Sequence, residues 1–173
     1  GQLLQNFVIA PADYRDATTL RHDVVARNAR LVSVRSSDRG RTWEAPRPYD
    51  LESPGPHDGT GESLAELGPI DFTNKDVFVW SSSTAFGTPQ SRPYVRVSKD
   101  AGRTWSRAFR LPLERLPSAS ANASHLVRPD GLSLLFLTMV SKDGRTRRPM
   151  VYGNVPDGST WHFLSFITPI EDP

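Results

Sequence analysis

Six short segments of the chain are either apolar or alternate between apolar and polar residues. They are 2–9, 29–35, 76–81, 92–97, 132–140 and 149–153. Alternation with a period of two is typical of β-strands, because successive side chains point to opposite faces of a sheet. Turn-forming Pro, Gly, Ser and Asp residues separate the segments. The only helix-like stretch, 63–67, is too short for a stable helix. The pattern therefore predicts an all-β protein.

An eight-residue frame, Ser-x-Asp-x-Gly-x-Thr-Trp, occurs twice along the chain and a third time in degenerate form. Its fixed residues are Ser36, Asp38, Gly40, Thr42 and Trp43 in the first copy, Ser98, Asp100, Gly102, Thr104 and Trp105 in the second, and Gly158, Thr160 and Trp161 in the third. The third copy has a proline where the others have the aspartate. The three tryptophans are spaced by about 60 residues, so the chain is a repeat of about three modules.

The residue types of this frame suit a hairpin turn. An aspartate carboxylate accepts hydrogen bonds from backbone N–H groups of the turn, and glycine adopts a positive φ at little cost. Serine and threonine hydroxyls bond locally, and the tryptophan is expected to pack the turn onto the sheet.

A repeated sheet of about four strands per module is typical of the blades of a β-propeller. The frame resembles the Asp-box, also called the BNR repeat, of sialidases, and this resemblance implies a six-bladed propeller. In those proteins the Asp-box lies on an outer turn away from the active site, so the resemblance implies that Asp38 and Asp100 are structural residues and not a catalytic acid or base. The blade modules are then approximately 1–50, 51–116 and 117–173, so that the chain supplies about three blades. An open arc would expose apolar faces and strand edges. We expect the remaining half of the propeller to come from the same gene, a second chain or a homodimer.

Composition excludes several classes of function. The chain has 173 residues, no cysteine and a formal net charge of +2. Disulfides, thiolate catalysis and cysteine-bound zinc are therefore excluded, and the four histidines lack metal-ligand spacing, so we expect no metal and no cofactor. The nearly balanced charge does not favour nucleic acid as a partner. No apolar run approaches the roughly 20 residues that a membrane-spanning helix needs.

The resemblance implies a glycan substrate and a sialidase-like exo-glycosidase. Sialidases bind the substrate carboxylate with three arginines and attack the sugar with a tyrosine, which a glutamate assists, while an aspartate serves as acid and base. Arginine suits carboxylates because its planar guanidinium binds them with two parallel hydrogen bonds. The chain has 18 arginines and three lysines, and most of these arginines are expected to be ordinary surface charge.

Glu62 is the candidate for the glutamate that assists the tyrosine. The stretch 60–68, with Glu62 and Glu66 before an apolar segment, resembles the sialidase segment that carries this glutamate. The alternative is a solvated loop carboxylate. The arginine that sialidases carry after the apolar segment has no match, because Ser82 stands there, and Arg92 is a loose replacement.

Arg147 and Arg148 are the candidates for a carboxylate-binding arginine. Sialidases place this arginine about seven residues before the serine of an Asp-box, and counting back from Asn154 leads to Arg147. Arg148 is its neighbour on the opposite face of the strand, so one of the two would point inwards. The alternative is that both arginines are ordinary surface residues in contact with water, beside the predicted turn at 142–145.

Asp16 and Asp23 are the candidates for the acid and base, together with Asp13, because all three lie in the loop between the first two predicted strands. The first arginine of the triad is expected before Gly1, and the nucleophilic tyrosine beyond the end of the chain. Tyr152 precedes the third copy of the frame and is not a candidate nucleophile.

Two other functions fit the same fold. One is a non-catalytic Asp-box propeller that binds a glycan or a protein, which the missing arginine at Ser82 favours. The other is a related glycosidase that acts on neutral sugars such as arabinan and needs no arginine triad. Resemblance to glycan-processing proteins also implies a secreted, periplasmic or cell-surface location.

Overall fold

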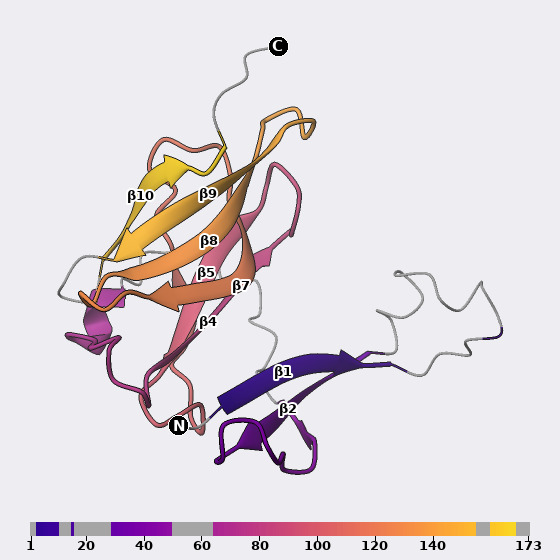
Figure 1. Ribbon diagram of the computed structural model, residues 1–173. Coiled ribbons are helices and arrows are strands. Elements are labelled where there is room, and N and C mark those ends of the chain that lie inside the picture. Colours follow the sequence, from indigo (N-terminus) through magenta and orange to yellow (C-terminus); the bar gives the residue numbers. More distant parts are fainter. Residues whose placement is uncertain (1–2, 11–14, 16–28, 50–63, 155–159, 169–173) are drawn as a thin grey trace. The chain divides into compact units, whose positions relative to one another are not determined.

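The computed structural model describes residues 3–10, 15, 29–49, 64–154 and 160–168. The chain divides into two compact units, 1–55 and 56–173. Every strand pair in the described residues is antiparallel, and the strands form three sheets (Figure 1). The one helical segment in this part of the chain is the short 3-10 helix η1 (Leu64–Leu67). The prediction of an all-β protein is thus confirmed.

In the ranges that the structure describes, no helix has the length and apolar character that crossing a bilayer requires.

The first unit contains a three-stranded sheet in the order β1-β2-β3. Its strands are β1 (Leu3–Ile9), β2 (Arg30–Ser36) and β3 (Arg47–Pro48). Along the β1–β2 pair Leu3 lies opposite Ser36 and Ile9 lies opposite Arg30, without a shift of register. All three strands fall within the first predicted module.

The second unit contains two sheets. The three-stranded sheet has the order β4-β5-β6, and the four-stranded sheet has the order β10-β9-β8-β7. The strands are β4 (Phe78–Thr84), β5 (Arg92–Ser98), β6 (Phe109–Arg110), β7 (Ser120–Val127), β8 (Ser133–Val140), β9 (Arg147–Asn154) and β10 (Trp161–Phe166). Each sheet falls within one of the remaining predicted modules. The six predicted segments correspond to β1, β2, β4, β5, β8 and β9.

The core of the second unit lies between its two sheets. Alternate residues of β5 and β8 face each other there, because Val95 and Leu135 are fully buried and Arg96 points away from the core. Burial removes apolar surface from water and is the main favourable term in holding the sheets together. The buried cluster comprises Leu64, Ile70, Phe72, Val95, Val97, Phe109, Leu111, Ala119, Ala121, Leu135, Leu137, Met139, Met150, Tyr152 and Trp161.

Strand β7 lies beside β4 and links the two sheets. The sequence did not predict β7, because its residues are mostly small and polar and do not alternate cleanly. The pairing with β8 also shifts register between Ala121 and Ser124. A bulge of this kind interrupts the period-two pattern on which strand prediction relies.

The first copy of the repeated frame is a turn held by its own side chains. The Asp38 carboxylate accepts hydrogen bonds from the Thr42 backbone N–H at 2.9 Å, the Thr42 hydroxyl at 2.7 Å and the Ser36 hydroxyl at 2.8 Å. The Gly40 N–H donates to the Ser36 hydroxyl at 2.7 Å, and Gly40 has a φ of 86°. The bonds and the positive φ are those that the residue types predict.

The second copy repeats the same bonds. The Asp100 carboxylate accepts from the Thr104 N–H at 2.9 Å, the Thr104 hydroxyl at 2.6 Å and the Ser98 hydroxyl at 2.7 Å. The Gly102 N–H donates to the Ser98 hydroxyl at 2.7 Å. Hydrogen bonds from the Thr104 hydroxyl and backbone N–H hold the pKa of Asp100 far below its usual range. The hydrogen bonds to Thr42 likewise lower the pKa of Asp38 to about 2.

The tryptophans of the three copies differ in burial. Trp161 is 2% exposed, whereas Trp43 is 45% exposed and donates its indole N–H to the Gly40 carbonyl within the turn. Trp161 is therefore part of the core, whereas Trp43 stays half exposed beside its own turn, so the expected packing of tryptophan onto the sheet does not hold for Trp43. Gly158 of the third copy lies outside the described residues.

His125 is a half-buried polar residue beside the same core. Its ring makes edge contacts with Phe72 and Trp161, and its Nε2 lies 2.5 Å from the Ser133 hydroxyl. Burial lowers the pKa of His125 to about 4, because the apolar surroundings disfavour the charged imidazolium.

The Ser98→Ala substitution tests the contribution of the frame to stability. It removes the acceptor of the buried Gly102 N–H and the donor to Asp100, so we expect the free energy of unfolding to fall by about 1–3 kcal/mol. Urea denaturation measures this value. The control is Ser165→Ala at an exposed position of β10, where a change within about 0.5 kcal/mol is expected. Equal losses in both variants would contradict the role of the frame.

The second stability prediction concerns acid. Between pH 6.5 and 4 the unfolded chain binds a proton at His125 that the folded chain does not bind, so stability is lost as the pH falls. The loss reaches about 3 kcal/mol at pH 4. Unfolding free energies at pH 7 and pH 4.5 should differ less in His125→Gln than in the unsubstituted protein. An identical pH dependence of the two proteins would refute the assignment.

Candidate functional site

Two hairpin turns from different sheets of the second unit meet at one end of the strands. They are the β4–β5 turn, 85–91, and the β8–β9 turn, 141–146. The Arg147 side chain donates from Nη2 to the Gly87 carbonyl at 3.4 Å. A Cβ atom on Gly144 would lie 3.6 Å from Pro89 Cγ, so the two turns are in contact. We call these two turns and the strand residues next to them the hairpin end.

The β4–β5 turn is closed by local hydrogen bonds. The Thr88 N–H and hydroxyl both donate to the Ala85 carbonyl, and the Ser91 N–H donates to the Thr88 carbonyl. Ala85 and Gly87 both have positive φ angles, of 46° and 73°. Glycine meets this requirement without strain. The turn therefore has a fixed shape that presents the Gly87 carbonyl to Arg147.

The β8–β9 turn uses the same chemistry as the repeated frame. The Asp143 carboxylate accepts hydrogen bonds from the Ser141 hydroxyl and from the Arg145 N–H. The Thr146 N–H donates to the Ser141 hydroxyl at 2.9 Å, and Gly144 has a φ of 75°. Hydrogen bonds from the Ser141 hydroxyl and the Arg145 N–H hold the pKa of Asp143 below its usual value. Asp143 is therefore an anion whose carboxylate is hydrogen-bonded within its own turn.

Buried serines fix the hairpin end to the start of β7. The Ser120 hydroxyl donates to the Ser91 hydroxyl at 2.8 Å and accepts from the Gly87 N–H at 2.9 Å. The Ser118 hydroxyl bonds both the carbonyl and the N–H of Val140. All three serines are buried, so water cannot replace their hydrogen-bond partners. Sequence reasoning missed all three, although Ser118 and Ser120 stand close together at the start of β7.

The three candidate arginines lie at this end but in different environments. Arg147 is exposed, and its side chain reaches the β4–β5 turn, where it bonds the Gly87 carbonyl. Arg148 is half-buried, with its guanidinium 3.5 Å from the centre of the Phe166 ring. Arg92 is half-buried and donates from Nη1 to the carbonyl of Ser91 at 2.8 Å, and to two further backbone carbonyls. Alternation along β9 thus separates Arg147 from Arg148, as the sequence predicts.

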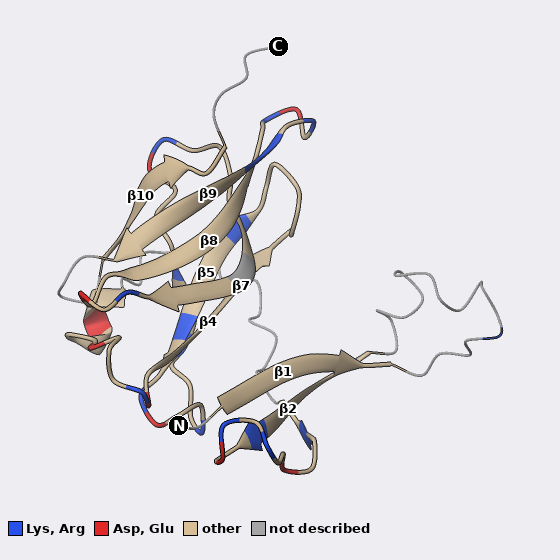
Figure 2. Ribbon diagram, viewed as in Figure 1, with Lys and Arg blue, Asp and Glu red and all other residues tan. Residues whose placement is uncertain are grey.

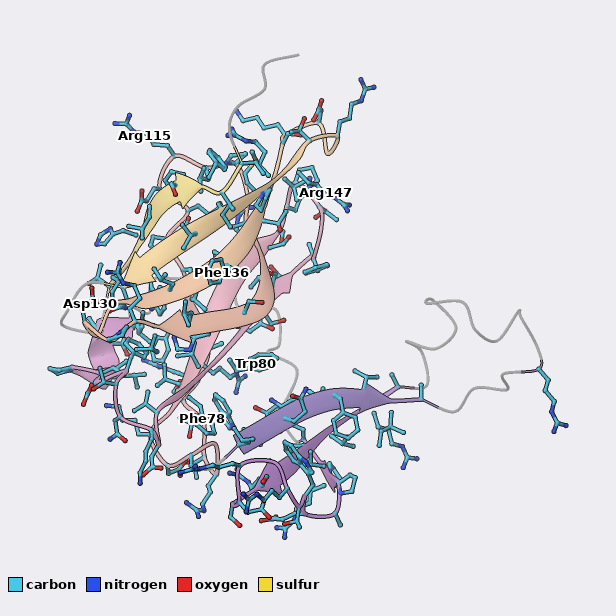
Figure 3. All side chains as sticks on the ribbon, viewed as in Figure 1. Phe78, Trp80, Arg115, Asp130, Phe136 and Arg147 are labelled. Carbon is cyan, nitrogen blue, oxygen red and sulfur yellow. The ribbon has the colours of Figure 1, made fainter. Side chains whose placement is uncertain are left out.

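Positive charge gathers at the tip of the β8–β9 hairpin. Lys142, Arg145 and Arg147 are all exposed there, and the neighbouring Asp143 is bonded within the turn. Figure 2 shows basic residues at this tip, and Figure 3 places Arg147 at the end of the strands away from Asp130. The tip can therefore attract an anion, although charges this exposed are weakened by salt.

A shallow hollow lies beside Arg92 on the face of β5 that points away from the core. It is lined by Thr84, Arg92, Tyr94, Ala108 and Arg110. Burial raises the pKa of Tyr94, so its phenol is neutral near pH 7. Arg92 donates to backbone carbonyls and Tyr94 bonds with Ser82, so both side chains are already engaged beside this hollow.

The candidate carboxylates are not placed by the structure. Glu62, Asp16 and Asp23 all lie outside the described residues. Glu66 of η1 pairs with Arg107, and both side chains are about half exposed. Within the described ranges no group of three His, Cys, Asp or Glu side chains could hold a metal ion. The hairpin end therefore contributes cations and hydroxyl groups, and any acid or base must come from elsewhere.

Tyr152 is buried and does not face solvent. Its hydroxyl donates to the Pro112 carbonyl at 2.9 Å, and the residue is 0% exposed. Burial and the nearby Glu114 carboxylate raise the pKa of Tyr152 well above its usual value. A phenol in this state cannot act as a nucleophile on an external substrate.

The Tyr152→Phe substitution tests this reading. It leaves the Pro112 carbonyl without its donor, so we expect the free energy of unfolding to fall by about 1–3 kcal/mol. Any catalytic activity of the intact protein should stay within about twofold of the unsubstituted value. Loss of activity at unchanged stability would show that Tyr152 takes part in the reaction.

Comparison with solved structures finds similar folds at low sequence identity. The chain is similar to a protein described as Hadza microbial sialidase Hz136, with a TM-score of 0.58 and 14% identity, over 96% of this chain and 35% of the other. It is also similar to a protein of unknown function from Dyadobacter fermentans DSM 18053, with a TM-score of 0.61 and 20% identity, over 99% of this chain and 52% of the other. The chain thus spans about a third and a half of these two structures.

Sequence comparison adds no assignment. No protein-family model matches the chain, and no curated protein matches it. At these levels of identity the structural likeness concerns the fold alone. It is consistent with a portion of a β-propeller.

Proposed function

We propose that the chain is part of a sialidase-like exo-glycosidase, built on a six-bladed β-propeller, that removes a terminal acidic sugar from glycans. The observation that carries the proposal is the exposed Arg147 at the hairpin end. Its position in the sequence is the one that the resemblance gives to a carboxylate-binding arginine. The likeness of the fold to part of a sialidase chain supports this.

Arg147 is suited to bind a carboxylate. Its Nη2 group donates to the Gly87 carbonyl, which restrains the side chain before a ligand arrives. A guanidinium has five N–H donors in a planar fork, so this one bond leaves donors for the two oxygens of a carboxylate. The nearby Lys142 and Arg145 add positive charge that favours an anionic substrate over a neutral one.

Arg92 and Arg148 take supporting positions in this proposal. Arg92 donates to the Pro89 and Ser91 carbonyls of the β4–β5 turn and to the Pro117 carbonyl before β7, and so fixes the turn that Arg147 contacts. Arg148 lies over Phe166, where a cation over an aromatic face is stabilised. Arg147 is therefore the first candidate of the three for direct contact with substrate.

The resemblance implies the reaction sequence. A tyrosine outside this chain attacks the anomeric carbon, and Glu62 takes the tyrosine proton, while Asp16 or Asp23 protonates the departing oxygen. Water then replaces the tyrosine at the same carbon, with the aspartate as base, and the product retains its configuration. Glu62 raises the nucleophilicity of a phenol that is a poor nucleophile at its ordinary pKa.

The alternative is a propeller that binds a glycan or protein without catalysis, or a glycosidase for neutral sugars such as arabinan. The observation that favours it is Ser82 on β4, where the resemblance expects a second arginine. Ser82 is occupied by a hydrogen bond with Tyr94. The same fold supports many functions, so the activity itself has to decide.

Hydrolysis of a fluorogenic sialoside by the intact protein tests the proposal. We expect Arg147→Ala to lower kcat/KM about 10- to 100-fold, because it removes charge-assisted hydrogen bonds to the carboxylate. Glu62→Gln should lower kcat at least about 100-fold, as expected for the loss of a general base.

The matched control is Arg115→Ala, which removes an exposed charge outside the hairpin end and should change kcat/KM by less than about twofold. Turnover of an arabinoside but not of the sialoside would favour the neutral-sugar alternative. No turnover of either by the intact protein would contradict an enzymatic function.

A further inference from the structure

The tip of the β8–β9 hairpin carries two cations besides Arg147. Lys142 lies in the turn, Arg145 lies two residues before Arg147, and all three side chains are exposed (Figure 2). Two residues of backbone span at most about 7 Å, so the long side chains of Arg145 and Arg147 reach neighbouring parts of one ligand. The tip therefore offers more positive charge than a single carboxylate needs.

The one acidic residue of this turn does not neutralise these cations. The Asp143 carboxylate accepts hydrogen bonds from the Ser141 hydroxyl and the Arg145 backbone N–H, which hold it within the turn. Among the described residues neither Lys142 nor the Arg145 side chain forms an ion pair. Both side chains are thus available to an anion from outside.

Other exposed arginines of the second unit are paired with a carboxylate. Arg107 pairs with Glu66, and Arg128 pairs with Asp130 at 2.8 Å. A neighbouring carboxylate cancels much of the field of such an arginine, so these positions attract an anionic ligand weakly. The tip of the β8–β9 hairpin differs from them because its cations lack this compensation.

The turn that carries the cations has a fixed shape. The Gly144 N–H donates to the Ser141 carbonyl at 2.9 Å, and the Thr146 N–H donates to the Ser141 hydroxyl at 2.9 Å. Gly144 also lies against Pro89 of the β4–β5 turn. A turn that is already ordered loses little conformational freedom when a ligand binds. Lys142 and Arg145 are therefore held close to Arg147 before the ligand arrives.

From these observations we propose that Lys142 and Arg145 form a second anion subsite, which binds a carboxylate or sulfate group on the sugar next to the terminal acidic sugar. This subsite rests on the proposed function, in which Arg147 binds the terminal carboxylate. Two anions on adjacent sugars repel each other, and separate cations offset that repulsion. The substrate class is then a glycan with acidic groups on both of its last two sugars.

Binding of three matched disaccharides to the intact protein tests this subsite. Each has a terminal sialic acid joined through sulfur, which resists hydrolysis, to galactose, to galacturonate or to galactose 6-sulfate. The second sugars differ only at C6, which is neutral or carries a carboxylate or a sulfate. Isothermal titration at about 10 mM ionic strength, where exposed charges are little screened, gives the three dissociation constants.

We expect both acidic disaccharides to bind about fivefold more tightly than the neutral one, as two exposed ion pairs allow. Combining Lys142→Ala with Arg145→Ala should reduce this ratio to less than about twofold. The ratio cancels any effect on the terminal sugar, which all three ligands share. Arg115→Ala removes an exposed charge outside the hairpin end and should leave the ratio unchanged. A preference for only one of the two anions would support the subsite and identify its ligand.

Equal binding of all three disaccharides by the unsubstituted protein would overturn the subsite. A ratio that survives in the Lys142 and Arg145 double variant would also overturn it, as would the absence of binding by any of the three. Failure of the proposed glycosidase gives a different result, because it is seen as a lack of hydrolysis of the fluorogenic sialoside, whatever the three dissociation constants are.

Discussion

The structure of the second unit depends on the apolar contact between its two sheets. Val95 and Phe109 on one side and Leu135 and Tyr152 on the other are at most 1% exposed. Substituting one such side chain by alanine typically costs about 2–5 kcal/mol, a large fraction of the stability of a domain. This contact brings two hairpins into register, although they are about 50 residues apart in sequence. Because the apolar contact places the hairpins side by side, Arg147 can bond Gly87 and Ser120 can bond Ser91.

Polar chemistry then fixes the turns at both ends of the strands. At one end of β5 the Ser98, Asp100 and Thr104 side chains close the turn of the repeated frame, and the hairpin end lies at the other. The β8–β9 turn uses a serine and an aspartate in nearly the same way, through Ser141 and Asp143. A carboxylate that accepts several N–H and O–H groups from its own turn is strongly held as an anion. These aspartates therefore shape the loops, and the exposed basic side chains beside them are left to face a ligand.

Much of the fold could be predicted from the sequence, and less of the site. Alternation located β8 and β9, and the frame located the turns, because both patterns are local. The sequence pattern did not predict β7, because its pairing partner and its bulge are determined by the tertiary structure. Strand alternation predicted that Arg147 and Arg148 lie on opposite faces of β9, but not which of the two is exposed. The serine contacts at the hairpin end depend on packing between distant segments, which no local pattern encodes.

A crystal structure of the intact protein with bound sialic acid would test the central claim most directly. The account predicts that the sugar carboxylate lies within hydrogen-bonding distance of the Arg147 guanidinium, beside the β4–β5 turn. A sugar bound away from the hairpin end, or one whose carboxylate makes no contact with Arg147, would contradict it.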